Sequence, residues 1–295
     1  MGVDVDPQVL SVSASAAAHA VEQAKVHIVE ETKARDPSNL TALMDSLAPA
    51  GPYAYTIMPR TSGGTIQLPV LTTREEIHEA YGFVRGLSDL HDVVGLTEVA
   101  GTWYLFQDAM TVGGPKDSDV RNHRQTLGLF PSGREHGITG ELVWLRVPYE
   151  QLGAETDELV QADDELHARL LVHSRFQEHL AGLRANDVSA VLAAIGDGAA
   201  SAIRDYVDGD GGLVELSGRD AHRSWYSRFF ETFEVQQVQV LHSVTDTWYA
   251  FAELRITARR GDDVVAFHTA EFHVRGRDGR FVARIGHGTE PALLP

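Results

Sequence analysis

The amino-acid sequence predicts an α+β protein made of two consecutive domains with the same order of elements. Its length of 295 residues is enough for about two domains, each with its own core. In each half, three stretches with helical spacing of apolar residues precede stretches with the composition of strands. A short aromatic pattern, TWYLFQDA at residues 102–109, returns as TWYAFAEL at 247–254.

In the first half, residues 1–15 are small, polar and aperiodic, and we expect a loose leader there. The first domain then spans 16–148. Asp36-Pro37 ends its first helix, and Thr72 or Thr73 can cap its third. The helices are expected at 16–33, 40–48 and 72–87, the strands at 92–100, 102–112 and 140–147, and a long insert at 113–139.

Residues 149–165 are acidic and lack aromatic side chains, so we expect a linker between the domains. The second domain, 166–295, repeats the order of the first. Asp278-Gly279 predicts the turn of its last hairpin. Its helices are expected at 165–184, 188–195 and 218–233, and its strands at 238–245, 247–259, 263–275 and 280–288.

One gap-free shift of 145 positions overlays the two halves. The shift pairs residues of a helix and of two strands, which is the pattern of an internal duplication. The pairs are Arg74 with Arg219, Tyr81 with Tyr226, Val93 with Val238, Leu96 with Leu241, Trp103 with Trp248, Tyr104 with Tyr249, Phe106 with Phe251 and Asp108 with Glu253.

Composition narrows the possible partners. The formal net charge of −17 argues against nucleic acid, since phosphate binding needs a basic surface. No apolar run approaches the roughly 18 residues of a membrane span, and the N-terminus lacks the features of a secretory signal. The absence of cysteine excludes disulfides and thiolate chemistry. We therefore expect a cytoplasmic protein whose partner is a small molecule.

The ordered set of elements resembles the nuclear-transport-factor-two-like superfamily, which includes SnoaL-like polyketide cyclases, ketosteroid isomerases and scytalone dehydratase. The segments that carry the resemblance are HLAGLRANDVSAVLAAIGDGA, SGRDAHRSWYSRFF and EFHVRGRDGRFVARI, all in the second half. The resemblance implies two cone-shaped domains, each with three N-terminal helices packed on a bent antiparallel sheet. It also implies an apolar pocket or a filled core inside each cone. The two copies could pack on each other as an intramolecular pseudo-dimer, and homo-oligomers are left open.

Strand parity predicts which side chains face the pocket of the second domain. In DVVAFHTAEFHVR, the face with Ala270 and Phe272 is apolar except for His268, so we expect it to point inward. His268 is then a candidate acid or base, with a structural role equally open. The resemblance places the isomerases' oxyanion-hole acid near Ala270, where this chain has no acid.

Further candidates come from the other elements of the second domain. The resemblance places His179 near a tyrosine donor of the isomerases, and Asp205 near their general base. His242 and His287 alternate with apolar residues on their strands, which favours structural roles. The pocket lining is expected to comprise Ala270, Phe272, His242, Tyr206, Trp225 and His287, and the catalytic set His268, Asp205 and His179.

No metal or cofactor is expected, because the sequence has no HExxH, no HxH on a strand, no phosphate loop and no nucleophile elbow. The function that remains is cofactor-independent acid–base chemistry on a small hydrophobic substrate. Isomerisation, cyclisation, dehydration or hydration of a polyketide-, steroid- or terpenoid-like molecule would fit. The alternative is a non-catalytic binder or a dimerising scaffold of the same fold.

Overall fold

A computed structural model describes residues 7–56, 59–62, 65–133, 135–146 and 165–294. The chain folds as two compact units. Unit 1 consists of Met1–Ile57 and Leu71–Arg146, and unit 2 consists of Met58–Val70 and Val147–Pro295. A short segment from the first half of the sequence therefore belongs to unit 2. The expected linker at 149–165 lies outside the described residues except for Glu165, which starts a helix.

The elements of unit 1 alternate between helices and strands. Its helices are α1 (Pro7–Lys33), α2 (Thr41–Asp45) and α3 (Arg74–Leu87). Its sheet has the order β4-β1-β8-β7-β6-β5. The strands are β1 (Ala54–Thr56), β4 (Val70–Leu71), β5 (Ser88–Ala100), β6 (Tyr104–Pro115), β7 (Asn122–Pro131) and β8 (Gly140–Leu145).

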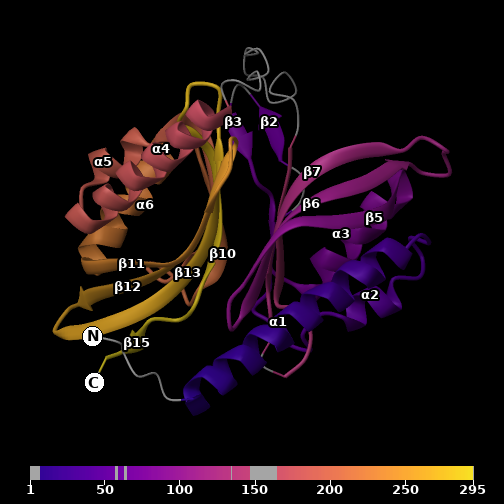
Figure 1. The fold of residues 1–295 in the computed structure, drawn as a ribbon, viewed down its shortest axis with the longest axis horizontal. Helices are drawn as coiled ribbons and strands as arrows, with labels where there is room; N and C mark the ends of the chain where they lie inside the picture. The colour runs from indigo at the N-terminus through magenta and orange to yellow at the C-terminus, as the bar shows by residue number, and fades with distance from the viewer. Residues whose placement is uncertain (1–6, 57–58, 63–64, 134, 147–164, 295) are drawn as a thin grey trace. The chain divides into compact units, whose positions relative to one another are not determined.

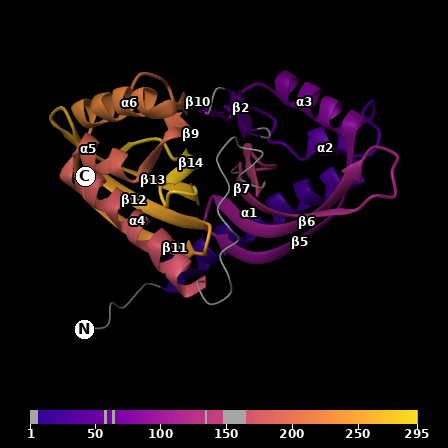
Figure 2. The ribbon, with the colours of Figure 1, turned by 90° about the horizontal axis from the view of Figure 1, so that it is seen from above.

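Unit 2 has the same arrangement, with helices α4 (Glu165–Ala185), α5 (Val188–Ala193) and α6 (Gly218–Thr232) on one face of its sheet (Figure 1). The sheet has the order β10-β9-β14-β13-β12-β11, and β15 pairs with β13. Its strands are β9 (Ile195–Asp205), β10 (Gly212–Ser217), β11 (Glu234–Thr245), β12 (Tyr249–Arg260), β13 (Asp263–Arg275), β14 (Phe281–Gly288) and β15 (Ala292–Leu293). Helix α6 lies next to β9 and β10 (Figure 2).

The two sheets can be matched strand by strand. In both, the last long strand pairs in parallel with the strand that follows the second helix, β8 with β1 and β14 with β9. The pairings of β5 with β6, β6 with β7 and β7 with β8 in unit 1 are antiparallel, as are those of β9 with β10, β11 with β12, β12 with β13, β13 with β14 and β13 with β15 in unit 2. The predicted α+β class with two tandem cone-type domains is confirmed, with one difference. Strands also form between the second and third helices, so each sheet is mixed.

The helix boundaries follow from capping. Thr73 accepts a hydrogen bond from the backbone N–H of Glu76, whose side chain accepts in return, which makes a capping box at the start of α3. Asp187 caps α5 in a similar way, through the N–H groups of Ser189 and Ala190.

The repeated arginines occupy matching places. Arg74 donates to the carbonyl of Met44 at the end of α2, and Arg219 donates to the carbonyl of Leu192 at the end of α5. Each arginine thus adds a side-chain hydrogen bond to a carbonyl in the last turn of the helix, beside the backbone N–H that the same carbonyl accepts.

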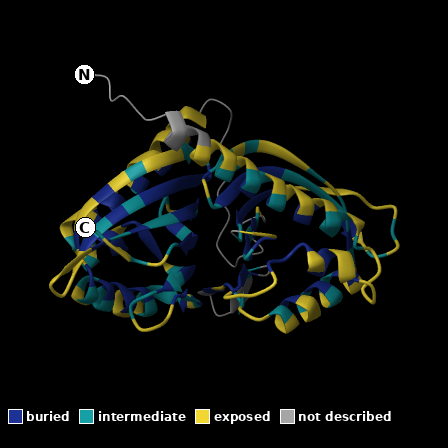
Figure 3. Cartoon of the chain, turned by 90° about the horizontal axis from the view of Figure 1, so that it is seen from below, coloured by how far each residue is buried: buried dark blue, intermediate teal, exposed yellow. Residues whose placement is uncertain are grey.

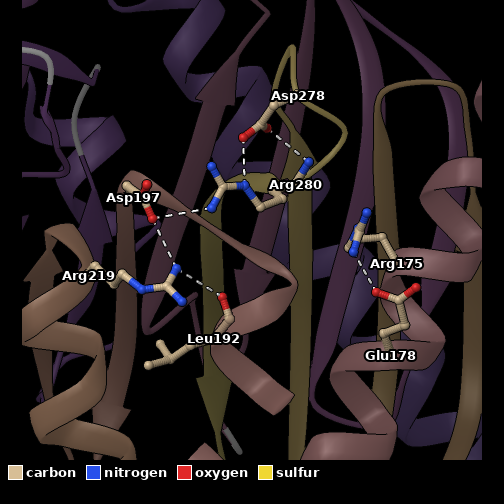
Figure 4. Close-up of polar contacts among 7 residues, drawn as sticks. All are labelled: Arg175, Glu178, Leu192, Asp197, Arg219, Asp278 and Arg280. Carbon is tan, nitrogen blue, oxygen red and sulfur yellow. Dashed lines mark hydrogen bonds and ion pairs between the residues drawn. The ribbon is translucent and has the colours of Figure 1, made fainter. Parts of the chain in front are cut away.

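The surface end of unit 2 holds a network of ion pairs (Figure 4). Asp197 accepts hydrogen bonds from Arg219 at 3.0 Å and from Arg280 at 3.2 Å. Arg280 also pairs with Asp278 in the β13–β14 turn, where Gly279 has a φ of +77°. The predicted Asp278-Gly279 turn is therefore confirmed, and the network ties this turn to α6 and β9. The same view shows Arg175 paired with Glu178 on α4.

Three expectations about the elements were wrong. Helix α1 begins at Pro7, so residues 7–15 are helical instead of a loose leader. Nearly half of the expected insert at 113–139 is strand, because β6 runs to Pro115 and β7 covers Asn122–Pro131. Strands β9 and β10 were missed because their small and polar residues lack the alternation typical of strands.

A separate hairpin, β2 (Arg60–Ser62) with β3 (Thr65–Gln67), completes the edge of unit 2. The backbone N–H of Leu68 donates to Glu215 of β10 at 2.8 Å, and Ser217 donates to the carbonyl of Ile66 at 3.1 Å. Ile66 and Leu68 are buried. Figure 3 shows buried residues gathered along the strands and the outer sides of the helices exposed, whereas the edge strands β5 and β11 are largely exposed or half-buried. Among the described residues, no helix is long and apolar enough to cross a membrane.

Candidate functional site

Unit 2 contains a cavity of ≈ 50 Å³ between its helices and the inner face of its sheet. The inner face is the face turned toward α4, α5 and α6. Most of the lining is apolar and aromatic, including Trp225, Phe229, Phe233, Ile256 and Phe267. A cavity of this size exceeds the space of about 10–15 Å³ that one water needs. It can therefore hold a chemical group larger than a water molecule.

A buried ion pair forms one polar patch of the lining. Arg284 of β14 donates to Glu271 Oε2 through Nη2 at 2.6 Å and through Nε at 3.1 Å. Register places these strands side by side, with Glu271 opposite Gly286 and Arg284 opposite His273. Burial alone would raise the pKa of Glu271, but Arg284 and a hydrogen bond from His273 outweigh it and hold that pKa well below its usual range. Glu271 is therefore an anion that anchors Arg284.

Tyr226 of α6 is held by the same arginine. Arg284 Nη1 donates to the Tyr226 hydroxyl oxygen at 2.7 Å, and both residues line the cavity. Burial raises the pKa of Tyr226 to about 12, so the phenol stays protonated at neutral pH. Because its oxygen already accepts from a cation, its O–H is a polarised donor. It is available to an occupant of the cavity.

Behind this pair lie two buried histidines. His273 Nε2 and Glu271 Oε1 are 2.9 Å apart, and the His273 ring contacts the His179 ring of α4 at 4.8 Å between centroids. Burial lowers the pKa of both imidazoles, so both are neutral at neutral pH. The lining includes Glu271 but neither histidine. His179, expected to be catalytic, thus lies in the core behind the cavity.

Three of the expected lining residues do line the cavity: Tyr206, Trp225 and His287. Burial, followed by the charge of Arg204, lowers the pKa of His287 well below its ordinary value. A neutral imidazole there can accept a proton or a hydrogen bond. Tyr206 accepts a hydrogen bond from Arg204 at 3.2 Å.

Asp205 lies next to the cavity, at the end of β9, but is not part of its lining. Its Oδ1 accepts hydrogen bonds from the N–H of Val207 at 2.9 Å and from Trp225 Nε1 at 3.3 Å. These bonds fix the turn after β9 and the orientation of the Trp225 indole. The structure thus gives Asp205 a local structural role.

The predicted inner face of β13 was wrong. Val265 and Phe267 belong to the core beneath the helices, and Thr269 and Glu271 line the cavity, so the odd-numbered residues face inward. His268, Ala270 and Phe272 therefore lie on the opposite face. His268 is half-buried there, with its Nδ1 3.2 Å from Glu253 Oε1. The alternation of side chains along β13 did not reveal the inner face because both faces of the strand are buried. Ala270 and Phe272 are as inaccessible to solvent as Glu271.

His242 was also misplaced as a lining residue. Val238 and Val240 pack against the helices, but a β-bulge between Val240 and His242 reverses the alternation. The His242 ring consequently turns to the opposite face, where its Nδ1 lies 3.0 Å from Glu253 Oε2.

Unit 1 holds a second polar cluster at the positions that correspond to Tyr226 and Arg284 of unit 2. Tyr81, the repeat partner of Tyr226, donates to Glu141 of β8. His27 of α1 contacts Tyr81 at 2.9 Å and Glu141 at 3.3 Å through Nε2, and Ser46 at 2.7 Å through Nδ1. Register through the paired strands makes Glu141 the counterpart of Arg284, because Leu142 corresponds to Ile285. The two units thus carry opposite charges beside the same tyrosine.

Sequence reasoning missed Glu271, Arg284 and His273 as site residues. The repeat did pair Tyr81 with Tyr226, but Tyr226 was not among the expected site residues. A usable signal was present in Glu271-x-His273, two polar residues that must share one face of a strand.

No family model matches the chain, and no curated protein matches it. Solved structures do match. Bal32a, from a soil-derived mobile gene cassette, is 15% identical, with 42% of this chain and 92% of that chain covered and a TM-score of 0.35. An LEH-like epoxide hydrolase of Mycobacterium tuberculosis is 17% identical, with 43% and 85% covered and a TM-score of 0.34. A ketosteroid isomerase-like protein from Erwinia carotovora atroseptica is 16% identical, with 42% and 97% covered and a TM-score of 0.33.

These matches concern the fold, and each spans less than half of this chain. The element order of each unit, helices interleaved with a mixed sheet whose long strands form an antiparallel meander, agrees with the resemblance seen in the sequence.

Proposed function

We propose that unit 2 binds a small, largely apolar molecule through an oxygen function and converts it by acid–base chemistry. The observation that supports this most directly is the Tyr226 hydroxyl, held by Arg284 at the wall of an otherwise apolar cavity. Apolar walls with a few oriented polar groups are typical of small-molecule sites.

Each group has a distinct role in this proposal. Tyr226 donates its hydrogen bond to a carbonyl or epoxide oxygen, and Arg284 stabilises the negative charge that develops there. His287, neutral and in the lining, accepts the proton that must leave a carbon or a water. Glu271 holds Arg284 in place and is not the base, because its carboxylate is engaged by Arg284 and His273. Isomerisation, cyclisation, dehydration and hydration all fit this donor–acceptor pair, on polyketide-, steroid- or terpenoid-like molecules.

The test is a panel of apolar ketones and epoxides incubated with the whole protein, with products followed by mass spectrometry. We expect Tyr226→Phe to lower kcat/KM by about 100-fold or more, the scale on which a positioned acid contributes. Tyr81→Phe, at the matching position of unit 1, and His268→Ala, on the opposite face of the sheet, are controls that keep full activity. Full activity in Tyr226→Phe would show that the tyrosine is not the donor.

The alternative is a non-catalytic binder of the same molecules. The bonds of the Glu271 carboxylate to Arg284 and His273 favour this alternative. They keep Glu271 from acting as the base, so that His287 would have to serve as the base of the lining. Calorimetric titration of the same panel separates the two functions. A binder takes up ligand without turnover, and Tyr226→Phe then weakens the affinity by about 10-fold, the loss of one hydrogen bond to a ligand.

A further inference from the structure

The cluster behind the cavity has the composition of a metal site. His179, Glu271 and His273 each offer one ligand atom, and these atoms lie within 4.8 Å of one another. All three side chains are at most 1% exposed. Glu271 and His273 project from one face of β13, and His179 projects toward them from α4, so two rigid elements hold the three groups.

His179 has an unusual hydrogen-bonding state. Among the residues that the structure describes, neither of its ring nitrogens has a hydrogen-bond partner, and the Nδ1 of His273 has none either. Buried polar groups without partners are rare in native proteins, and each calls for an explanation. An imidazole that faces a second imidazole and a carboxylate, with its lone pair unused, is explained by a cation between them.

We infer that His179, Glu271 and His273 form a binding site for one divalent transition-metal ion, with Zn²⁺ as the probe. Two imidazoles and one carboxylate are a ligand set that zinc accepts, with a fourth position left for a water or another donor. Zinc bonds of about 2.0–2.2 Å in a tetrahedron place ligand atoms about 3.3 Å apart. His273 Nε2 and Glu271 Oε1 are already 2.9 Å apart, so they need to separate by only a few tenths of an ångström.

The ion pair with Arg284 engages one carboxylate oxygen of Glu271 and leaves the other oxygen for the ion. Arg284 bonds to Glu271 Oε2, so Oε1 is the oxygen that faces the histidines. A ligating carboxylate whose second oxygen is held by another residue is a common arrangement in metal sites. Both histidines are neutral, which is the form that coordinates metals.

Unit 1 provides a comparison within the same chain. His27, Glu31 and Glu141 also have ligand atoms within 4.8 Å of one another. There, however, both ring nitrogens of His27 have partners, Ser46 on one side and Tyr81 with Glu141 on the other. Hydrogen bonds already satisfy this cluster, so the inference applies to unit 2 alone.

The proposed ion takes no direct part in the proposed acid–base step. Neither histidine lines the cavity, and Tyr226 bonds to Arg284, which is not one of the three proposed ligands. The metal site would instead hold Glu271, and through it Arg284, in position. Failure of the metal experiment therefore leaves the test on Tyr226 unaffected.

The experiment uses the full chain after chelator treatment, with ZnCl₂ as the titrant in calorimetry and in thermal unfolding. We expect one ion per chain and a rise in the unfolding temperature at saturating Zn²⁺. His179→Leu fills the same core position without nitrogens, so we expect the metal-free variant to fold and to unfold like the wild type at pH 7 and above. Its affinity for zinc should fall by at least about 100-fold. His27→Gln, in unit 1, should keep full zinc affinity.

Co²⁺ gives a second readout that does not depend on a variant, since its ligand-field absorption reports coordination by the protein. Wild-type protein should show this absorption at one equivalent, and His273→Gln should lose it. Zinc affinity that survives in His179→Leu would assign the binding to surface histidines and overturn the inference. So would the absence of a stoichiometric Co²⁺ complex, or an equal loss of affinity in His27→Gln.

Discussion

Replacement of Glu271 by Gln tests the buried ion pair at the centre of unit 2. The change keeps the shape of the side chain and removes its charge. Arg284, 8% exposed, would then be a buried cation that has lost its carboxylate, while Tyr226 continues to accept one of its hydrogen bonds. Loss of one partner of a buried pair typically costs 3–5 kcal/mol, so we expect Glu271→Gln to lower the free energy of unfolding of unit 2 by about 3–5 kcal/mol.

A double-mutant cycle measures the interaction energy between Glu271 and Arg284 apart from their interactions with other residues. Arg284→Met alone leaves the Glu271 carboxylate buried without its cation and should cost a similar amount. The double variant Glu271→Leu/Arg284→Met has neither charge and should cost less than either single change. Hydrogen exchange of the amides of β13 and β14 is the suitable assay, because it reports the stability of unit 2 separately from unit 1.

The difference in unfolding free energy between wild type and Glu271→Gln should become smaller as the pH falls. The native pKa of Glu271 lies below the value of about 4.3 in an unfolded chain, so its stabilising contribution is fully present above that pH. It is lost as the pH falls further, and the gap between wild type and Glu271→Gln should narrow below about pH 4. A cost below about 1 kcal/mol at pH 7, or strict additivity in the cycle, would refute the account of Glu271 as the anchor of Arg284.

Two further predictions concern other parts of unit 2. Burial lowers the pKa of His179, so in metal-free protein it stabilises the fold above pH 6.5 and loses that contribution as the pH falls. Below pH 6.5, His179 should contribute a slope of about 1.4 kcal/mol per pH unit to the free energy of unfolding measured against pH, and His179→Leu should lack this contribution. An unchanged slope in the variant would contradict the burial of His179 as a neutral group. Glu215→Ala removes the acceptor of the Leu68 N–H and should speed exchange of that amide about 5-fold, a loss of roughly 1 kcal/mol, whereas unchanged protection would show that the hairpin docks without this bond.

The elements that could be predicted from the sequence are those with a strong local signal. Helices α3 to α6 and strands β11 to β14 were expected near their observed positions, because apolar periodicity, caps and the Asp278-Gly279 turn are local features. The strands β9 and β10 depend on pairing with distant partners, and residues such as Gly196 and Ala199 carry no strand preference of their own.

The site could be predicted only in part, for two physical reasons. The alternation of apolar and polar residues along a strand identifies the inner face only when the other face is exposed. It fails for β13 because both of its faces are buried. Periodicity also assumes an unbroken register, which the bulge at His242 violates. The lining includes Tyr206, Trp225 and His287, whereas Glu271 and Arg284, read from sequence alone, are charged residues of the kind that usually lie at the surface.

The hairpin formed by β2 and β3 has a consequence for how this protein is made. It is synthesised within the first half of the chain, yet it belongs to unit 2 and lies against β9 and β10, which leave the ribosome after residue 194. Domains usually fold in the order of their synthesis. Here the hairpin is synthesised before the strands of unit 2 that it contacts, whereas the last residue of unit 1, Arg146, is synthesised before β9 and β10. Expression of the C-terminal half on its own should therefore yield an incomplete unit, and the two halves of the gene cannot be exchanged as independent modules.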